Sequence, residues 1–190
     1  MNKIAKDRTQ KCLIIVPTRE LASQIQDEFR DLSQDTNIYA TLVIGGQNIK
    51  KQMNSVMRNP QFIIGTPGRL KDLYQRKILK LEQFNNIILD EVDRMLDMGF
   101  IPDITFLVSK LKKEKQALFF SATMSNEAER IANTILNDPV KVQVEKESPL
   151  KNIDQDIIRF KSPEEKYKLL EDLLYRSEEH TSELQSRQVI

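Results

Sequence analysis

Short apolar runs alternate with amphipathic stretches along most of this chain, and this alternation constrains its fold more than any other feature. The runs consist mainly of Ile, Leu, Val and Phe without regular polar residues between them, as in strands that are buried on both faces of a sheet. Because helical patterns separate them, we expect an α/β fold, with a parallel sheet and helices on both faces. The expected strands are residues 12–16, 38–44, 62–65, 86–89, 116–120 and 140–144. The expected helices are residues 20–32, 48–58, 68–76, 93–96, 102–111 and 126–136.

The last quarter of the chain differs from the rest. A first domain at residues 1–144 is followed by a polar, proline-containing stretch at 145–152, which indicates a linker. Residues 153–160 predict a strand. A helix should begin at Ser162, with Pro and Glu at favourable positions after this cap, and end near residue 175. Residues 176–190 look like translated sequencing-adapter DNA, so we expect an artefactual tail and assign no role to its histidine, His180.

Composition excludes several classes of protein. The net charge is +1 and the isoelectric point about 7.8, so any nucleic-acid binding must come from a local arrangement of groups. Cys12, the only cysteine, lies in an apolar run and should be a core residue. The sequence contains no cluster of Cys and His residues that could bind zinc. The chain shows no signal peptide and no apolar stretch that could span a bilayer, which predicts a cytoplasmic protein without a membrane partner.

Three carboxylates directly follow the apolar run at residues 86–89, in the string Asp90-Glu91-Val92-Asp93. The carboxyl ends of parallel strands are where open α/β sheets bind their ligands. There the first carboxylate can hold Mg²⁺ through water, and the second can orient or deprotonate an attacking water. The string therefore suggests the acidic half of a nucleotide-hydrolysis site. Taken alone, such a motif is more often a solvated acidic loop.

Other motifs also follow apolar runs. They are Pro17-Thr18-Arg19-Glu20-Leu21-Ala22, Gly45-Gly46, Thr66-Pro67-Gly68-Arg69 and Ser121-Ala122-Thr123. In this order, with the acidic string extended to Phe100, they resemble the DEAD-box family of ATP-dependent RNA helicases. The resemblance covers residues 11–144 and continues more weakly to about residue 175. Val92 stands where this family usually has Ala, a departure that leaves the ATPase interpretation in place.

The resemblance implies a fold, cofactors and a partner. It implies a RecA-like first domain, with the first strand and helix of a second RecA-like domain at residues 153–175. ATP and Mg²⁺ would be the cofactors, RNA the partner, and the full-length protein a monomer. Asp90 would position Mg²⁺ through water and Glu91 would activate the hydrolytic water. Asp93 would contact Ser121 and Thr123 and couple the nucleotide site to RNA, although these hydroxyls could instead cap the helix that follows.

The RNA-facing residues implied by the resemblance suit a sugar-phosphate backbone. Thr18 and Thr66 each precede a helix whose free N–H groups can bind an anion, and arginines add charge-assisted hydrogen bonds to phosphate. Such contacts are independent of base sequence. The alternative is that both threonines only cap helices. The set is Pro17, Thr18, Arg19, Gly46, Thr66, Pro67, Gly68 and Arg69.

A Gly-rich phosphate loop ending in Lys and Ser or Thr does not occur in the sequence. In the family this loop precedes the motif at Pro17, so it would lie before Met1. We therefore expect the parent protein to be an ATPase and this chain to be inactive alone. The absent strand would lie beside the one ending at Ser121, where we expect an exposed apolar edge. Two alternatives remain, a non-catalytic RNA-phosphate-binding remnant and a DNA-directed helicase of the same superfamily.

Overall fold

In a computed structural model of the chain, residues 4, 6, 7, 9–143 and 157–186 are described, the last eleven of them by backbone alone. The chain divides into two compact units, Met1–Val140 and Lys141–Ile190. The linker expected at residues 145–152 lies outside the described residues. The predicted domain boundaries stay predictions.

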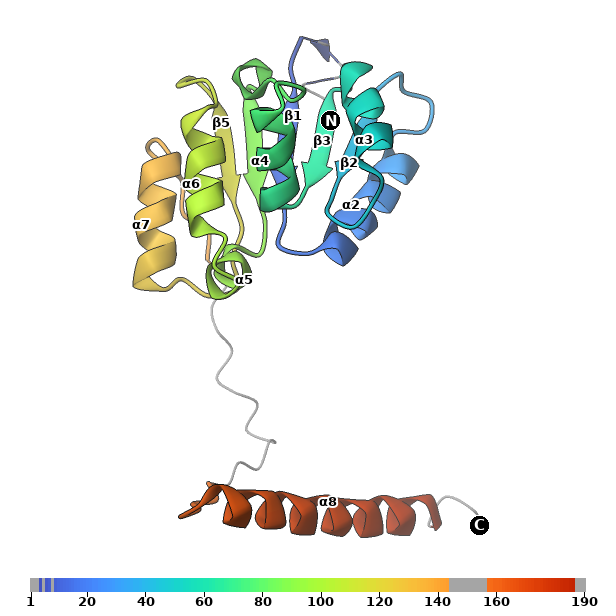
Figure 1. Cartoon of the computed structure of the whole chain (residues 1–190), viewed down its shortest axis with the longest axis vertical. Helices are drawn as coiled ribbons and strands as arrows, with labels where there is room; N and C mark the ends of the chain where they lie inside the picture. Colours follow the sequence, from blue (N-terminus) through green and yellow to red (C-terminus); the bar gives the residue numbers. More distant parts are fainter. Residues whose placement is uncertain (1–3, 5, 8, 144–156, 187–190) are drawn as a thin grey trace. The chain divides into compact units, whose positions relative to one another are not determined.

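Five parallel strands form a single sheet in the first unit, in the order β2-β3-β1-β4-β5 (Figure 1). The strands pair in register, so that β2, β3, β1, β4 and β5 all end at the same edge of the sheet. Every loop that leaves the carboxyl end of a strand therefore starts at this edge. The strands are β1 Cys12–Ile15, β2 Ala40–Val43, β3 Phe62–Gly65, β4 Asn86–Leu89 and β5 Gln116–Phe119.

Side-chain caps fix where several helices begin. Thr18 Oγ1 accepts a hydrogen bond from the N–H of Leu21 at 3.2 Å, and Asn48 caps the next helix in the same way. Thr18 therefore caps the helix that follows it, whereas Thr66 makes no side-chain cap, and the cap at Thr18 leaves its proposed contact with RNA a prediction. The helices of this unit are α2 Arg19–Leu32, α3 Ile49–Met57, α4 Pro67–Gln75, α5 Val92–Asp97, α6 Ile101–Ser109 and α7 Asn126–Ile135, with a 3₁₀ turn at Leu81–Gln83.

Helices bury both faces of the sheet, which confirms the predicted α/β architecture. Leu13 and Ile15 of β1 face a core shared with α3 to α7. Cys12 and Ile14 alternate with them and face a second core, to which α2 contributes Phe29. Cys12 is 3% exposed, and burial raises the pKa of its thiol to about 12. Cys12 is therefore a core residue, as expected.

β5 is the least buried strand, and it lies at the edge of the sheet. Leu118 is 41% exposed, and Phe120, just after the strand, is 51% exposed. The expected apolar edge is thus present among the described residues. The predicted strand at 140–144 is wrong over residues 140–143, where Val140 is 90% exposed. The β-propensity of valine has little effect where the side chain packs against nothing, and Pro139 removes a backbone donor.

The second unit contains one described helix, α8 Pro163–Ser186. Its predicted start is confirmed, since Ser162 Oγ accepts a hydrogen bond from the N–H of Glu165 at 3.3 Å. The predicted end near residue 175 is wrong, because residues 176–186 lack Gly and Pro and include the helix formers Glu, Leu and Gln. Residues 157–160 form no strand, and the rest of that expected strand is outside the described residues. None of the described helices has the length and apolarity needed to cross a membrane.

Candidate functional site

The sheet topology gathers all the predicted site residues at the edge where the strands end. The loops after β2, β3 and β1 carry the glycine, threonine and arginine motifs, and these three strands are neighbours in the sheet. The loops after β4 and β5 carry the carboxylates at 90–93 and the hydroxyls at 121–123. The order of strands, which differs from their order in the sequence, therefore separates a side that carries arginines, threonines and glycines from an acidic side.

A groove of about 600 Å³ lies on the side that carries the arginines. Six of the eight residues predicted to face RNA line it, and the exceptions are Pro67, which is buried, and Gly46, which lies beneath Arg19. Sequence reasoning missed Asp72 and the apolar wall formed by Met98 and Phe100. Asp72 could have been found from its place one helical turn after Arg69. The full lining is Pro17, Thr18, Arg19, Gly45, Thr66, Gly68, Arg69, Asp72, Met98 and Phe100.

Arg19 is exposed and lies directly over the Gly45-Gly46 turn. A Cβ atom built on Gly46 would be 2.2 Å from Arg19 Nη1, and the backbone of Gly46 has a φ of +76°. Both observations require glycine at this position, since L-residues rarely adopt this conformation and the space is already filled. Gly46 therefore makes room for the guanidinium of Arg19.

Arg69 is held from within the protein, and its side chain is only 15% exposed. Its Nη1 donates hydrogen bonds to the carbonyl oxygen of Gln47 at 3.2 Å and to Oε1 of Gln52 at 3.1 Å. Its Nε lies 4.0 Å from Oδ2 of Asp72. Among the hydrogen bonds of the described residues, none uses Nη2 of Arg69. The guanidinium is thus fixed on one side and can donate to a ligand from the other.

The acidic side begins at the end of β4. Oδ1 of Asp90 accepts a hydrogen bond from the N–H of Glu91 at 2.9 Å, while Oδ2 forms no hydrogen bond with the described residues. Glu91 has a left-handed backbone, with φ 52° and ψ 51°, and its Oε2 lies 3.2 Å from Nη1 of Arg94. Both partners of this pair are substantially exposed, so it contributes only about 0–1 kcal/mol. Neither carboxylate is committed to a buried structural contact.

Asp93 joins the loop after β4 to the loop after β5. Its Oδ2 accepts hydrogen bonds from the N–H and the hydroxyl of Thr123, both at 2.9 Å. Ser121 Oγ accepts from the N–H of Asp93 at 3.1 Å and donates to the carbonyl of Thr123 at 2.7 Å. The capping alternative for these hydroxyls is wrong, because Ser125 caps α7. The expected contact is present, and its coupling role stays a prediction.

Acid should weaken the contribution of Asp93 to stability. Burial by itself would raise the pKa of Asp93, but hydrogen bonds from Thr123 and Arg94, together with the nearby hydroxyl of Ser121, outweigh it and lower the pKa below its ordinary value. A carboxylate with a lowered folded-state pKa contributes stability above the ordinary Asp pKa of about 3.9, and the contribution is lost as pH falls through the folded-state value. Because Asp93 is largely solvated, we expect less than about 1 kcal/mol.

Urea denaturation of the Asp93→Asn variant at several pH values measures this contribution. The wild-type chain should be more stable than the variant at pH 7, and the difference should shrink toward zero below about pH 4. The exposed Asp31→Asn variant is the control for removing one carboxylate. A difference between Asp93→Asn and wild type that grows on acidification would contradict the expectation.

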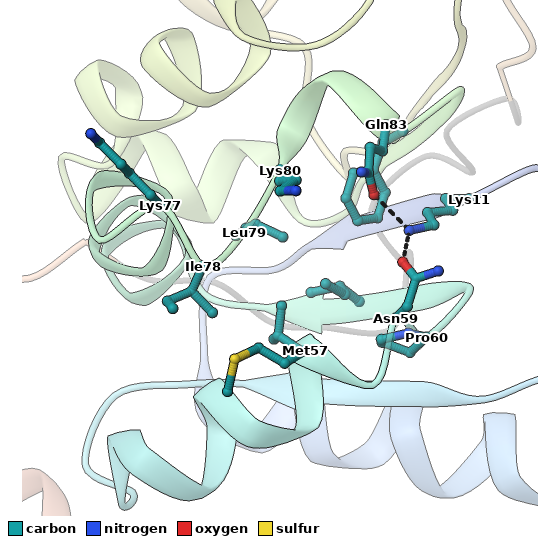
Figure 2. Close-up of a pocket in the computed structure, with 12 residues that line it drawn as sticks. Lys11, Met57, Asn59, Pro60, Lys77, Ile78, Leu79, Lys80 and Gln83 are labelled. Atoms are coloured by element: carbon teal, nitrogen blue, oxygen red, sulfur yellow. Dashed lines mark hydrogen bonds between the residues drawn. The ribbon is translucent and has the colours of Figure 1, made fainter.

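A second cavity, of about 420 Å³, lies at the opposite edge, where the strands begin (Figure 2). Its lining includes Lys11, Lys77 and Lys80 and no acidic residue. The ammonium group of Lys11 is held by the side-chain oxygens of Asn59 and of Gln83, the latter at 2.8 Å. Burial and the charge of Lys80 lower the pKa of Lys11.

These lysines have a structural explanation. Helices α3 and α4 end beside this cavity, and the carboxyl end of a helix carries a partial negative charge that nearby cations offset. In Figure 2 the Lys77 side chain points away from Lys11 and its partners. None of the predicted site residues lines this cavity, so we assign it no ligand.

Comparisons with known proteins agree on one family. The DEAD/DEAH box helicase model matches residues 1–131. The chain is 39% identical over 175 residues to the RNA helicase CrhR of Synechocystis sp., with 92% of the chain and 36% of that protein aligned. It is 41% identical over 146 residues to the DEAD-box ATP-dependent RNA helicase CshA of Bacillus subtilis, with 76% and 30% aligned. The chain thus spans about a third of the length of these curated relatives.

A solved structure is similar as well. The crystal structure of a DEAD box protein from Methanococcus jannaschii superposes with a TM-score of 0.65 at 38% sequence identity. The match covers 68% of this chain and 35% of that one. This likeness confirms the RecA-like α/β fold predicted for the first unit.

Proposed function

Since the chain belongs to the DEAD/DEAH box helicase family, we propose that the whole protein is an ATP-dependent RNA helicase that clamps and locally unwinds RNA. The described part of this chain would supply the RNA-backbone groove and the acidic half of the nucleotide site. The names of its relatives CrhR and CshA, both RNA helicases, support this proposal. A cytoplasmic location and a monomeric full-length protein stay predictions.

The order of the strands carries the proposal. Three neighbouring strands deliver the arginines, threonines and glycines to one groove, and the next two deliver the carboxylates and hydroxyls beside it. Phosphoryl transfer requires charge and positioned groups more than covalent chemistry. A helicase must in addition connect its nucleotide site to its nucleic-acid site. The hydrogen bonds of Asp93 to Thr123 provide a direct link between the two loops of the acidic side.

Asp90 suits a magnesium ion held through water. Mg²⁺ keeps several of its waters and binds proteins through one or two carboxylates together with substrate phosphates. Asp90 has one oxygen without a hydrogen bond to the described residues, and no three metal-binding side chains of those residues converge on a site. The ion would neutralise phosphate charge, while Glu91 would orient the attacking water and accept its proton.

Binding of RNA to the chain tests the groove. Replacing both Arg19 and Arg69 by Ala should weaken binding of a labelled single-stranded RNA about 10-fold or more, measured by fluorescence anisotropy. Two lost phosphate contacts should also reduce the slope of log K against log salt concentration by about 1.4. The matched control replaces Arg30 and Arg58 by Ala, which removes the same charge at exposed positions outside the groove.

Other outcomes of the same assay separate the alternatives. Equal loss in both double variants would mean that binding follows net charge and not the groove. Tighter binding of a DNA strand of the same sequence would favour a DNA-directed helicase. RNA binding by the chain, without RNA-stimulated ATP hydrolysis by the whole protein, would favour the non-catalytic remnant. We also propose that residues 153–175 begin a second RecA-like domain and that residues 176–190 are artefactual.

A further inference from the structure

Gln52 is one of two buried polar residues in the described part of the chain, and it is 5% exposed. It lies in α3 on the same stripe as Ile49, Met53 and Val56, which pack toward the core. Both ends of its amide are used. Nε2 donates to the carbonyl oxygen of Ile44 at 2.9 Å, and Oε1 accepts from Arg69 Nη1 at 3.1 Å.

These bonds determine how Arg69 lies in the groove. The two N–H groups of Nη1 go to Gln52 and to the carbonyl of Gln47. Because the guanidinium is planar and its donors form a rigid fork, fixing Nη1 fixes the whole group. The N–H groups of Nη2, which the described residues leave unused, are then held in place before a ligand arrives.

We propose that Gln52 is a positioning residue that orients Arg69 toward an RNA phosphate in the groove. The bond to Ile44 sets the orientation of the amide, because it holds the NH₂ group on the carbonyl and directs the oxygen to Arg69. Gln52 thereby connects the end of β2 with α4, two parts of the groove that are distant in sequence. The inference rests on the proposed function and adds to it a residue that does not itself reach the ligand.

The neutral amide has an advantage over a carboxylate at this position. A glutamate would hold Arg69 by a charge-assisted bond, and would also neutralise the charge that attracts phosphate. Its oxygen would face the carbonyl oxygen of Ile44 without a proton between them, which leaves a buried acceptor unpaired. Glutamine fixes the guanidinium and leaves its full charge available to RNA.

Two variants and a double-mutant cycle test this inference, again with labelled single-stranded RNA. Gln52→Met has nearly the same size but loses both hydrogen bonds, and we expect binding about 5–10-fold weaker. In an Arg69→Ala background the same change should weaken binding less than about 2-fold, because residues that act through one contact are not additive. Gln75→Met, at an exposed position of α4, is the matched control and should bind like wild type.

Gln52→Glu is the second test variant, and it keeps an oxygen that can accept the hydrogen bond from Arg69. It should bind more weakly at low salt and reduce the salt slope by about 0.7, the value for one phosphate contact on a single strand. Urea denaturation of each variant shows whether it is folded. If Gln52→Met is not folded, the salt slope of Gln52→Glu decides whether the inference holds.

The results that overturn the inference are distinct from those that overturn the proposed function. Wild-type affinity in Gln52→Met would overturn it, as would an equal loss with and without Arg69, which indicates a structural effect alone. An unchanged salt slope in Gln52→Glu would also overturn it. If the wild-type chain bound no RNA, the proposed role of the groove would fail, and this inference with it, whereas RNA-stimulated ATP hydrolysis by the whole protein tests the proposed function separately.

Discussion

Replacing Glu91 by Gln is expected to lower kcat for RNA-stimulated ATP hydrolysis by the whole protein about 10²–10⁴-fold, the usual contribution of a general base. Glutamine has nearly the same shape, and among the described residues the one contact that it changes is the exposed pair of Glu91 with Arg94. The fold should therefore be preserved. RNA affinity of the chain should also be unaffected, because Glu91 does not line the groove.

Steady-state ATP hydrolysis with and without RNA measures this effect. The control is Glu28→Gln, the same change at an exposed position of α2. Activity of Glu91→Gln within about threefold of wild type would show that another group activates the water. A loss of RNA binding in the same variant would instead point to a disturbed fold and remove the support for a chemical role.

Gly65→Ala should destabilise the first unit by about 3 kcal/mol, at the upper end of what overpacking usually costs. A Cβ atom at this position would be 2.4 Å from the carbonyl oxygen of Val43 and 3.1 Å from two side-chain atoms of Leu70. The first contact is with backbone, so it cannot be relieved by a side-chain rotation. β2 and β3 would have to separate where Thr66 N–H donates to Val43 at 3.1 Å.

A second glycine provides the control for this prediction. A Cβ atom on Gly68, within α4, would meet only Asp103 Oδ2, at 3.9 Å. Alanine favours helix over glycine by up to about 1 kcal/mol, so Gly68→Ala should be neutral or stabilising. Urea denaturation of the two variants measures both changes in the free energy of unfolding. Equal stability of Gly65→Ala and wild type would contradict the prediction, because it would mean that β2 and β3 can move apart at this position at little cost.

Much of the first unit could be predicted because short-range signals bound its elements. The strands at 62–65 and 86–89 match their predictions, since each apolar run is cut off by residues unsuited to a buried strand. Helices α2 and α7 begin within one residue of the predicted position, each directly after a capping Thr or Ser. Local chemistry therefore sufficed wherever the element was both capped and packed.

The predictions were wrong where local sequence signals do not determine whether an element forms or where it ends. Residues 140–143 have the β-branched pattern of a strand, but Val140 and Val142 are almost fully exposed. Their β-propensity therefore has little effect, because these side chains pack against no neighbouring strand in the described part of the chain. The helix α8 continues to Ser186 through a stretch whose composition changes without any helix-breaking residue. A change of composition is thus a weaker signal for the end of a helix than glycine or proline.

The site was found as a set of motifs, but their arrangement was not predictable. No local pattern states that the loop after β3 lies between those after β2 and β1, and this order forms the groove. Gln52 was missed although the sequence contains a signal for it. A glutamine that interrupts the apolar stripe of Ile49, Met53 and Val56 must find buried hydrogen-bond partners, and only the structure shows that Arg69 is one of them.

At Glu91, the residue type that would favour stability differs from the one that the proposed chemistry needs, because its backbone is left-handed. A non-glycine residue in this conformation is about 1–2 kcal/mol less favourable than glycine, and here the residue makes no capping hydrogen bond in return. Glycine at position 91 would relieve the backbone, and it would remove the carboxylate that we propose activates water. Engineering for thermostability alone would select that change, so a screen that does not also measure ATP hydrolysis would select against the activity.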